Sequence, residues 1–405
     1  MGSLLQNSDN EIVPKIEAIL ANAKSFKQGD FGARLGLLRQ IDDLYEALEP
    51  PINLFFKQWT WMTVFTCLEI VIKAGIFEKL KEKDNMSAQE LGEATGVDAG
   101  VIARAIRILV ANRIITSKSE DRYSHTPKSL IFTRGEHTAI DSFDLLTLLH
   151  KSYITIPNYV TTRPSTDLLD IRRSPYACAY GMEGSTFYET ISANPNHLET
   201  FNRSMNQPGP DYSIFPFASL RDEVLAARHR PFVVDVGGGN GNALRVVKAA
   251  TDNAFGCGAA LVLQDRPDVL AATTAAQRDG LQLMPYDFHD PQPVKDAHVY
   301  TLNQILHNYP DHLCADILKQ VRGAMGQTSR LLILDPILPA QTVVGGDMMG
   351  YLVDIVGLAM GGKERTEKEV GALLEAEGME IVKVWYGKAS ATSWQAVIEA
   401  RVKAA

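Results

Sequence analysis

The sequence predicts an α/β protein, with a Rossmann-like doubly wound parallel sheet that follows a helical winged-helix module. Three observations lead to this fold class. Apolar residues recur at three- and four-residue spacing up to about residue 130, short apolar runs alternate with helical stretches from residue 231 onward, and a glycine-rich turn follows the first of these runs. Such runs are typical of strands buried on both faces, as in a parallel sheet covered by helices.

The N-terminal part predicts two amphipathic helices, over 11–26 and 33–49. Ser87 then predicts the N-cap of a short helix, which is followed by a turn at Gly96, a helix over 98–111 and a pair of strands. This order of elements is typical of a winged helix-turn-helix.

The winged module leaves two functions open, DNA binding and dimerisation. Its second helix offers Arg104 and Arg107 among apolar residues, and Glu90 and Glu93 precede it. Entry into a DNA groove requires an exposed basic face, and a chain with net charge −8 is repelled on average by a phosphate backbone. We therefore expect a dimerisation module and no nucleic-acid partner.

The composition, 45% hydrophobic and 22% charged over 405 residues, allows a large core and more than one domain. The four cysteines are scattered without a CxxC pair, which indicates a reducing, cytoplasmic compartment. The N-terminus lacks the basic and apolar regions of a signal peptide. The apolar run 62–77 is interrupted by Glu69 and Lys73, so we expect no membrane segment.

The segment Val233–Val247, VVDVGGGNGNALRVV, is the strongest single signal for a ligand site. A strand ends at Val236, and four glycines form the turn into the next helix: Gly237, Gly238, Gly239 and Gly241. Glycine allows positive φ and close approach of a ligand to the backbone. The spacing departs from the dinucleotide pattern GxGxxG, and the absence of Gly-Lys-Ser/Thr excludes a nucleotide P-loop.

Acidic residues at the ends of the next two predicted strands indicate which class of ligand binds. Asp265 can accept hydrogen bonds from both ribose hydroxyls, Asp287 can accept from an adenine amino group, and Phe288 can stack on the ring. The alternatives are a helix N-cap at Asp265, a solvated loop around Asp287, and a metal site from Asp287, His289 and Asp290 that lacks a fourth ligand. Together the turn and the acids predict an adenosine ligand without a pyrophosphate, S-adenosylmethionine (SAM), and no metal.

His307, in the stretch ILHNYPD, has three interpretations when taken alone. A histidine beside an apolar run is most often a core residue whose ring is bonded to the backbone. The others are a metal ligand and a base that takes a proton from a substrate.

The motifs VVDVGGGNG, LQDRP, YDFHD, ILHNYPD, LLILDPILP and GGKERTEKE follow the winged module in order. Over residues 50–400 the chain resembles the class I SAM-dependent O-methyltransferases of the plant caffeate type and of fungal secondary metabolism. The resemblance implies a dimerisation domain over 1–133, a helical, substrate-lining connector over 134–225, a SAM-binding catalytic domain over 226–405, and a homodimer. Trp59, Trp61 and Phe65 are then expected in dimer packing, with a reach into the substrate pocket as the alternative.

The same resemblance implies roles for single residues. His307 is expected to be the general base, oriented by Asp335 and Glu364, and Asn303 is expected beside the cofactor. A neutral imidazole is suited to take a proton from a phenol, whose pKa is about 10, and a carboxylate on the other ring nitrogen fixes the tautomer. The residues implied to line the substrate, on helices that could equally be core elements, are Phe201, Met205, Met348, Met349 and Ile355.

Three positions depart from the family pattern. Asn308 stands where relatives carry Asp, Asp335 where the plant enzymes carry Glu, and Asn303 where relatives carry Arg or Lys. Two functions therefore stay open. One is methylation of a hydroxyl on a small aromatic or polyketide-type metabolite. The other is a pericyclic or dehydration step in natural-product biosynthesis with SAM as a bound auxiliary, as in fungal O-methyltransferase-like enzymes.

Overall fold

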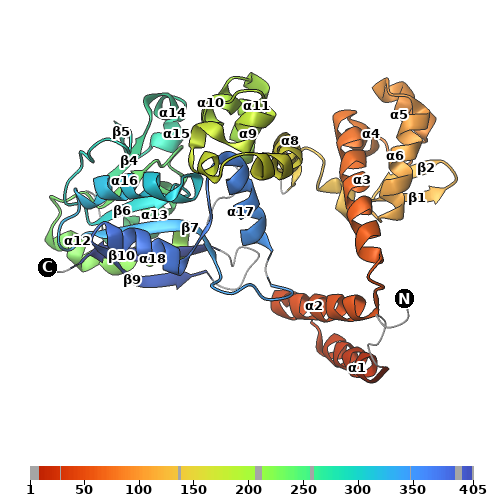
Figure 1. Cartoon of the computed structure of the whole chain (residues 1–405), viewed down its shortest axis with the longest axis horizontal. Coiled ribbons are helices and arrows are strands. Elements are labelled where there is room, and N and C mark those ends of the chain that lie inside the picture. Colours follow the sequence, from red (N-terminus) through yellow and green to blue (C-terminus); the bar gives the residue numbers. More distant parts are fainter. Residues whose placement is uncertain are drawn as a thin grey trace. The chain divides into compact units, whose positions relative to one another are not determined.

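The computed structural model describes residues 9–27, 29–135, 138–205, 212–255, 260–346, 348–387 and 395–403. The chain divides into two compact units, Met1–Leu148 and Leu149–Ala405, whose elements are labelled in Figure 1. The finer division into 1–133, 134–225 and 226–405 stays a prediction.

The first unit is helical apart from one two-stranded ribbon. In chain order it contains α1 (Asp9–Ser25), α2 (Phe31–Leu48), α3 (Asn53–Lys73), α4 (Ile76–Glu82), α5 (Ala88–Thr95), α6 (Ala99–Ala111), β1 (Ile115–Ser119), β2 (Arg122–His125), α7 (Pro127–Leu130) and the start of α8 (Ile140–Thr162).

The predicted N-cap at Ser87 is confirmed. Ser87 and Glu90 form a reciprocal capping box, and Gly96 ends α5 in the left-handed conformation at φ 75°. After α6 the strands β1 and β2 pair antiparallel, so the elements follow the predicted order of two helices and a ribbon. Apolar side chains of α3 to α6, among them Leu68, Leu91 and Ile106, form the core of this unit.

Membrane-spanning potential is low for the helices in the described part of the chain. None of them alone is long and apolar enough to cross a bilayer. The pair α3 and α4 passes this criterion only when the two helices are taken together, by length and composition, and they are bent by 60° at their junction.

The second unit begins with short helices. They are the rest of α8, η1 (Ser165–Leu169), η2 (Ile171–Arg173), α9 (Pro175–Ala179), α10 (Phe187–Ser192), α11 (Pro195–Met205), η3 (Tyr212–Ile214), η4 (Phe217–Leu220) and α12 (Arg221–Ala226). This agrees with the helical character expected for the connector.

The sheet that follows is mostly parallel, as predicted. Its strand order is β5-β4-β3-β6-β7-β10-β9, and β8 also pairs with β7. The strands are β3 (Val233–Val236), β4 (Leu261–Asp265), β5 (Gln282–Pro285), β6 (Val299–Asn303), β7 (Arg330–Leu338), β8 (Arg365–Thr366), β9 (Met379–Tyr386) and β10 (Gln395–Val402). β9 and β10 pair antiparallel with each other, and β10 pairs antiparallel with β7.

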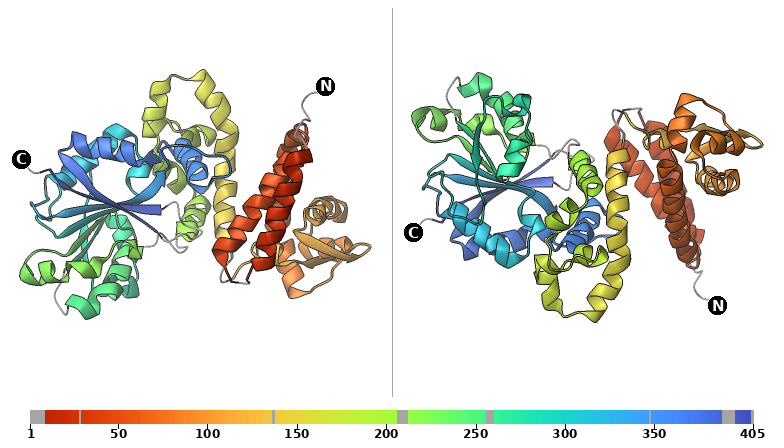
Figure 2. Two further views of the ribbon diagram at one scale, coloured as in Figure 1. Left: turned by 90° about the horizontal axis from the view of Figure 1, so that it is seen from below. Right: turned by 90° about the horizontal axis from the view of Figure 1, so that it is seen from above.

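Helices cover both faces of this sheet (Figure 2). The intervening helices are α13 (Asn242–Phe255), α14 (Pro267–Ala271), α15 (Ala275–Arg278), η5 (Leu306–Asn308), α16 (Asp311–Arg322), α17 (Met349–Met360) and α18 (Glu367–Ala376). Alternate β3 residues enter different cores: Val234 packs with Ile317 of α16, and Val233 packs with Leu244 of α13. A strand buried on both faces explains the continuous apolar run seen in the sequence.

Candidate active site

The carboxyl ends of β3, β4, β6 and β7 carry most of the predicted site residues. In an open α/β sheet with this topology, ligands bind where adjacent strands diverge toward their carboxyl ends. β3 pairs with β4 on one side and with β6 on the other. The strand order therefore reverses between β3 and β6.

The glycine turn after β3 is hydrogen-bonded to the neighbouring strand β4. The backbone N–H groups of Gly237 and Gly238 donate to the Gln264 carbonyl at 2.9 and 3.0 Å. A Cβ at Gly237 would lie 2.7 Å from Ile305 Cδ1, and one at Gly238 would lie 2.5 Å from Leu263 Cδ1. Packing therefore requires glycine at both positions.

Gly239 is the open position of the turn. It has φ 59°, and the space where a Cβ would stand has no atom within 4 Å. A ligand can therefore approach the backbone here, as the sequence suggested for the turn as a whole.

Asp265 lies at the end of β4 and faces this turn. Its Oδ2 accepts the Gly239 N–H at 2.8 Å, and its Oδ1 accepts the N–H of Arg266, also at 2.8 Å. Burial raises the pKa of Asp265, and the two backbone N–H bonds oppose the shift. Each carboxylate oxygen has a second lone pair, so the residue can still accept from a diol.

Asp287 and Phe288 follow β5. Asp287 is exposed, and its carboxylate accepts the His289 N–H at 3.0 Å. Phe288 is half-buried, with its ring edge-on to Tyr309 at 5.8 Å between centroids. Asn303 ends β6 and is half-buried.

His307 lies in η5, the short turn after β6, and its ring contacts Glu364. The His307 Nδ1 and Glu364 Oε1 atoms are 2.8 Å apart, with the two side chains 16% and 1% exposed. Desolvation lowers the pKa of His307, but the bond to Glu364 and the charge of Asp335 outweigh it, so the net pKa is raised. The Glu364 contact holds Nδ1 as the protonated ring nitrogen.

Asp335, from β7, lies at the same centre. It accepts a backbone hydrogen bond from His307, and burial raises its pKa to about 6. Among the described residues, neither Asp335 Oδ1 nor Glu364 Oε2 has a hydrogen-bond partner. The structure thus brings together the histidine and both carboxylates, although only Glu364 is seen to contact the ring.

Further residues hold this centre, and of these the sequence reasoning missed Gln304 and Arg365. Asp354 of α17 accepts the Glu364 N–H at 2.9 Å, and Asn308 donates its side-chain amide to the Gln304 carbonyl at 2.9 Å. Arg365 donates to the carbonyls of Leu306 and Tyr309, at 2.9 and 2.8 Å. Asn308 carried a signal as a departure from the family pattern, and the resemblance had implied Asp354 as a substrate-lining residue of α17.

The predicted substrate residues lie on two helices. On α11, Phe201 packs its ring 5.7 Å from Phe187, and Met205 is half exposed. On and beside α17, the side chains of Met348, Met349 and Ile355 are 59%, 42% and 43% exposed. The exposed fractions argue against simple core positions for these methionines and for Ile355.

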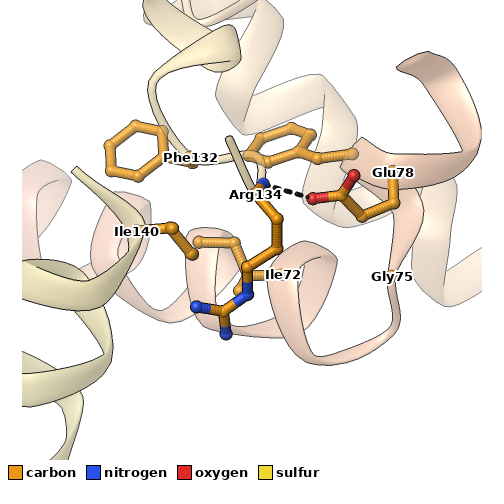
Figure 3. A pocket seen from close by; sticks show the side chains of 7 residues that line it. Ile72, Gly75, Glu78, Phe132, Arg134 and Ile140 are labelled. Carbon is orange, nitrogen blue, oxygen red and sulfur yellow. Dashed lines mark hydrogen bonds between the residues drawn. The ribbon is translucent and has the colours of Figure 1, made fainter. Parts of the chain in front are cut away.

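The first unit contains a small hollow, drawn in Figure 3. Its volume is about 80 Å³, and Glu78 in its wall accepts the Arg134 N–H at 2.7 Å. Ligand pockets are usually about 300–1,000 Å³, so the hollow is too small for a cofactor or a metabolite. Among the described residues, no group of three His, Cys, Asp or Glu side chains is arranged to hold a metal ion.

The arrangement fits SAM on its own chemistry. Asp265 offers acceptors to the ribose hydroxyls, Gly239 leaves open space beside the backbone, and Phe288 presents a half-buried aromatic ring. No basic P-loop side chain is present, in keeping with a ligand that lacks a pyrophosphate.

Comparison with known proteins places the chain in a family. Residues 165–380 match the O-methyltransferase domain, and residues 60–135 match the O-methyltransferase dimerisation domain. The chain is 58% identical to O-methyltransferase hmp5 of Hypomyces subiculosus over 398 residues, covering 98% of this chain and 99% of the relative.

The chain belongs to the O-methyltransferase family.

Solved structures agree with this assignment. OxaC in complex with SAH and oxaline superimposes with a TM-score of 0.83 at 25% identity, over 97% of this chain and 99% of the other. A structure described as a pericyclic reaction enzyme matches with a TM-score of 0.79 at 23% identity, over 97% and 100%. The second shows the shared fold alone.

Family membership confirms the predicted fold class, and the chain is a SAM-dependent O-methyltransferase by family. It also confirms SAM as the predicted cofactor. The dimerisation domain supports the predicted homodimer.

Proposed function

We propose that the chain transfers a methyl group to a hydroxyl of a small aromatic or polyketide-type secondary metabolite, with His307 as the general base. One observation carries the proposal: the 2.8 Å contact between His307 Nδ1 and Glu364 Oε1. His307 follows β6, the strand that pairs with β3, which leads into the glycine turn. The complex of OxaC with oxaline supports a natural-product acceptor.

Each site residue has its own role in the proposed methyl transfer. SAM supplies an electrophilic methyl group when it is bound. Asp265 and the glycine turn hold the adenosine part, and Phe288 covers its base. His307 takes the hydroxyl proton of the acceptor as the new bond forms, and the Glu364 carboxylate stabilises the resulting imidazolium. Asp335 adds negative charge to the same centre and fixes the backbone of His307. Met205, Met348, Met349 and Ile355 line the acceptor, for which flexible thioethers are suited.

The test uses methyl-labelled SAM with a panel of phenolic metabolites and mass spectrometry. We expect wild type to add one labelled methyl group, and His307→Ala to lose this transfer while binding S-adenosylhomocysteine as wild type does. His312→Ala, an exposed histidine on α16, is the matched control and should retain activity. Full transfer by His307→Ala would remove the base role.

The raised pKa of His307 favours a second candidate function. A ring whose charged form is stabilised donates hydrogen bonds, which suits a pericyclic or dehydration step on a substrate carbonyl. The same assay separates the two: conversion without a mass gain of one methyl group, or with loss of water, would support the non-methylating reaction.

A further inference from the structure

The turn that carries His307 contains a backbone conformation that ordinary side chains disfavour. Gln304, directly after β6, has φ 51°, one of five non-glycine residues with positive φ in the described part of the chain. Such a residue persists only where its surroundings hold it. Its N–H donates to the Leu334 carbonyl at 3.0 Å, which fixes one side of the peptide.

The other side of Gln304 is held by Asn308. The Asn308 Nδ2 atom donates to the Gln304 carbonyl at 2.9 Å. A carbonyl only accepts, so the amide nitrogen must face it. His307 lies between Gln304 and Asn308, in η5, so the Asn308–Gln304 bond closes the turn that carries the ring, whose Nδ1 lies 2.8 Å from Glu364 Oε1.

We propose that Asn308 is a positioning residue that holds the left-handed Gln304 turn and, with it, the ring of His307 against Glu364. An ionised Asp at this position would have no proton to donate and would repel the carbonyl. The departure from the family pattern thus has a structural role in this chain. The inference rests on the proposed role of His307, but its geometry does not depend on the reaction.

The backbone around His307 and Asn308 is tightly packed. The Lys363 N–H donates to the His307 carbonyl at 2.9 Å, and a Cβ at Gly362 would lie 2.9 Å from the Asn308 Cα, so the backbone after the turn is tightly enclosed. The ionisable or charged residues on the elements packed against His307 include Glu364, Asp335, Asp354, Arg365, Cys314, Lys363, Tyr309 and Tyr351. Among the described residues, none of these groups hydrogen-bonds to the Asn308 amide.

The experiment follows the titration of His307 in protein labelled with ¹³C at histidine Cε1, using His307→Ala to assign the signal. We expect Asn308→Ala to lower the pKa of His307 relative to wild type, because a released turn no longer holds the ring at Glu364, whose bond raises this pKa. Adding Gln304→Gly should move the pKa back toward wild type, because glycine adopts positive φ without a restraint and so restores the turn. Asn308→Ser, which shortens the side chain out of reach, replaces Asn308→Ala if that variant unfolds.

The matched control is Asn112→Ala. Asn112 Nδ2 donates to the carbonyl of Ile108, four residues earlier, at 2.8 Å, and so makes the same kind of bond at the end of α6. The His307 titration should be unchanged in this variant. An unchanged titration in Asn308→Ala, or a double variant that stays as shifted as the single one, would overturn the proposal.

Kinetics distinguish this inference from the proposed function. With an acceptor identified by the labelling assay, Asn308→Ala should lower kcat by roughly 3- to 10-fold, the effect of one net hydrogen bond, and leave KM for SAM unchanged. Asn308→Asp should also lower kcat, whereas a gain would mean that this position contacts the acceptor. If no acceptor is methylated but the titration shifts, the proposed function fails and the positioning role stands.

Discussion

At the scale of single residues, His307 is subject to effects that act on its pKa in opposite directions. Desolvation favours the neutral ring, while the bond to Glu364, the charge of Asp335 and the Gln304 carbonyl favour the imidazolium, and the second group prevails. This makes His307 a stronger base than an exposed histidine. It also means that the free enzyme carries a proton on His307 up to a higher pH.

The pH dependence of kcat/KM should report this balance. A general base must be neutral, so we expect kcat/KM to rise with pH through an apparent pKa above the ordinary histidine value of about 6.5. Glu364→Gln removes the charge that raises this pKa, so the acidic limb should move to lower pH, and kcat should fall by at least about tenfold as the ring loses its orientation. Glu367→Gln, on the exposed start of α18, is the control. An acidic limb that stays in place in Glu364→Gln would contradict the assignment.

Asp235, inside β3, provides a prediction on stability. It is fully buried, Thr301 Oγ1 donates to its Oδ1 at 2.6 Å, and burial raises its pKa to about 6 from 3.8. The folded state therefore binds this proton more tightly than the unfolded state. The contribution is fully present below the unfolded pKa and is lost as pH rises toward 6.

Asp235→Asn removes that pH dependence. Relative to wild type, the variant should gain stability between about pH 4 and pH 7, by at most about 3 kcal/mol. Denaturant unfolding at the two pH values measures it. Asp222→Asn, at a side chain that is 96% exposed, is the control. A stability difference that is the same at both pH values would show that the Asp235 carboxyl is not perturbed.

Some site residues could be predicted from the sequence and others could not, for physical reasons. Asp265, Asp287 and His307 were found because strand ends follow from apolar runs, and strand ends gather at one edge of a parallel sheet. Gln304 was missed because a left-handed residue followed by a short turn has no periodic pattern. The direct contact of Glu364 with the ring depends on how β8 pairs with β7, a two-residue strand that propensity does not reveal.

At the scale of elements, the long buried strands were predictable and the short edge elements were not. β3, β6 and β7 appear in the sequence as apolar runs because both faces are covered. β5 is partly exposed, with a weaker pattern, and ends at Pro285, before Asp287. The turn after β3 is set by crowding from Leu263 and Ile305, which the glycine spacing implied without naming its cause.

Gly238→Ala tests that crowding separately from backbone conformation. Gly238 does not have positive φ, but a Cβ there would meet Leu263 Cδ1 at 2.5 Å and the Asp235 carboxylate. We expect the free energy of unfolding to fall by about 1–3 kcal/mol and binding of S-adenosylhomocysteine to weaken, measured by denaturation and calorimetry. Gly36→Ala, in α2 with no atom within 4 Å of its Cβ position, should instead be neutral or stabilising. Wild-type affinity in Gly238→Ala would show that the turn can move aside.

At the scale of the whole molecule, the first unit exposes more apolar surface than a monomer usually tolerates. The helices α1, α2 and α3 carry large apolar side chains that are at least 37% exposed: Val13, Ile16, Leu20, Leu35, Leu38, Ile41, Tyr45, Leu48, Leu54, Phe55, Phe56, Trp59, Trp61 and Met62. Exposed apolar patches of this kind mark interaction surfaces. Part of this surface precedes the matched dimerisation domain, which starts at residue 60.

The assembly prediction follows from this surface. We expect light scattering at micromolar concentration to give a mass of two 44.6 kDa chains. Trp59, 61% exposed in the single chain, should lie in the interface, because burying an aromatic side chain contributes about 1.5–3 kcal/mol. Trp59→Glu would place a charge there without a partner and should shift the mass toward a single chain. Val382→Glu, at a 47% exposed position on β9 in the second unit, should leave the mass unchanged. A wild-type mass of one chain would contradict the homodimer, and a dimeric Trp59→Glu would exclude Trp59 from its interface.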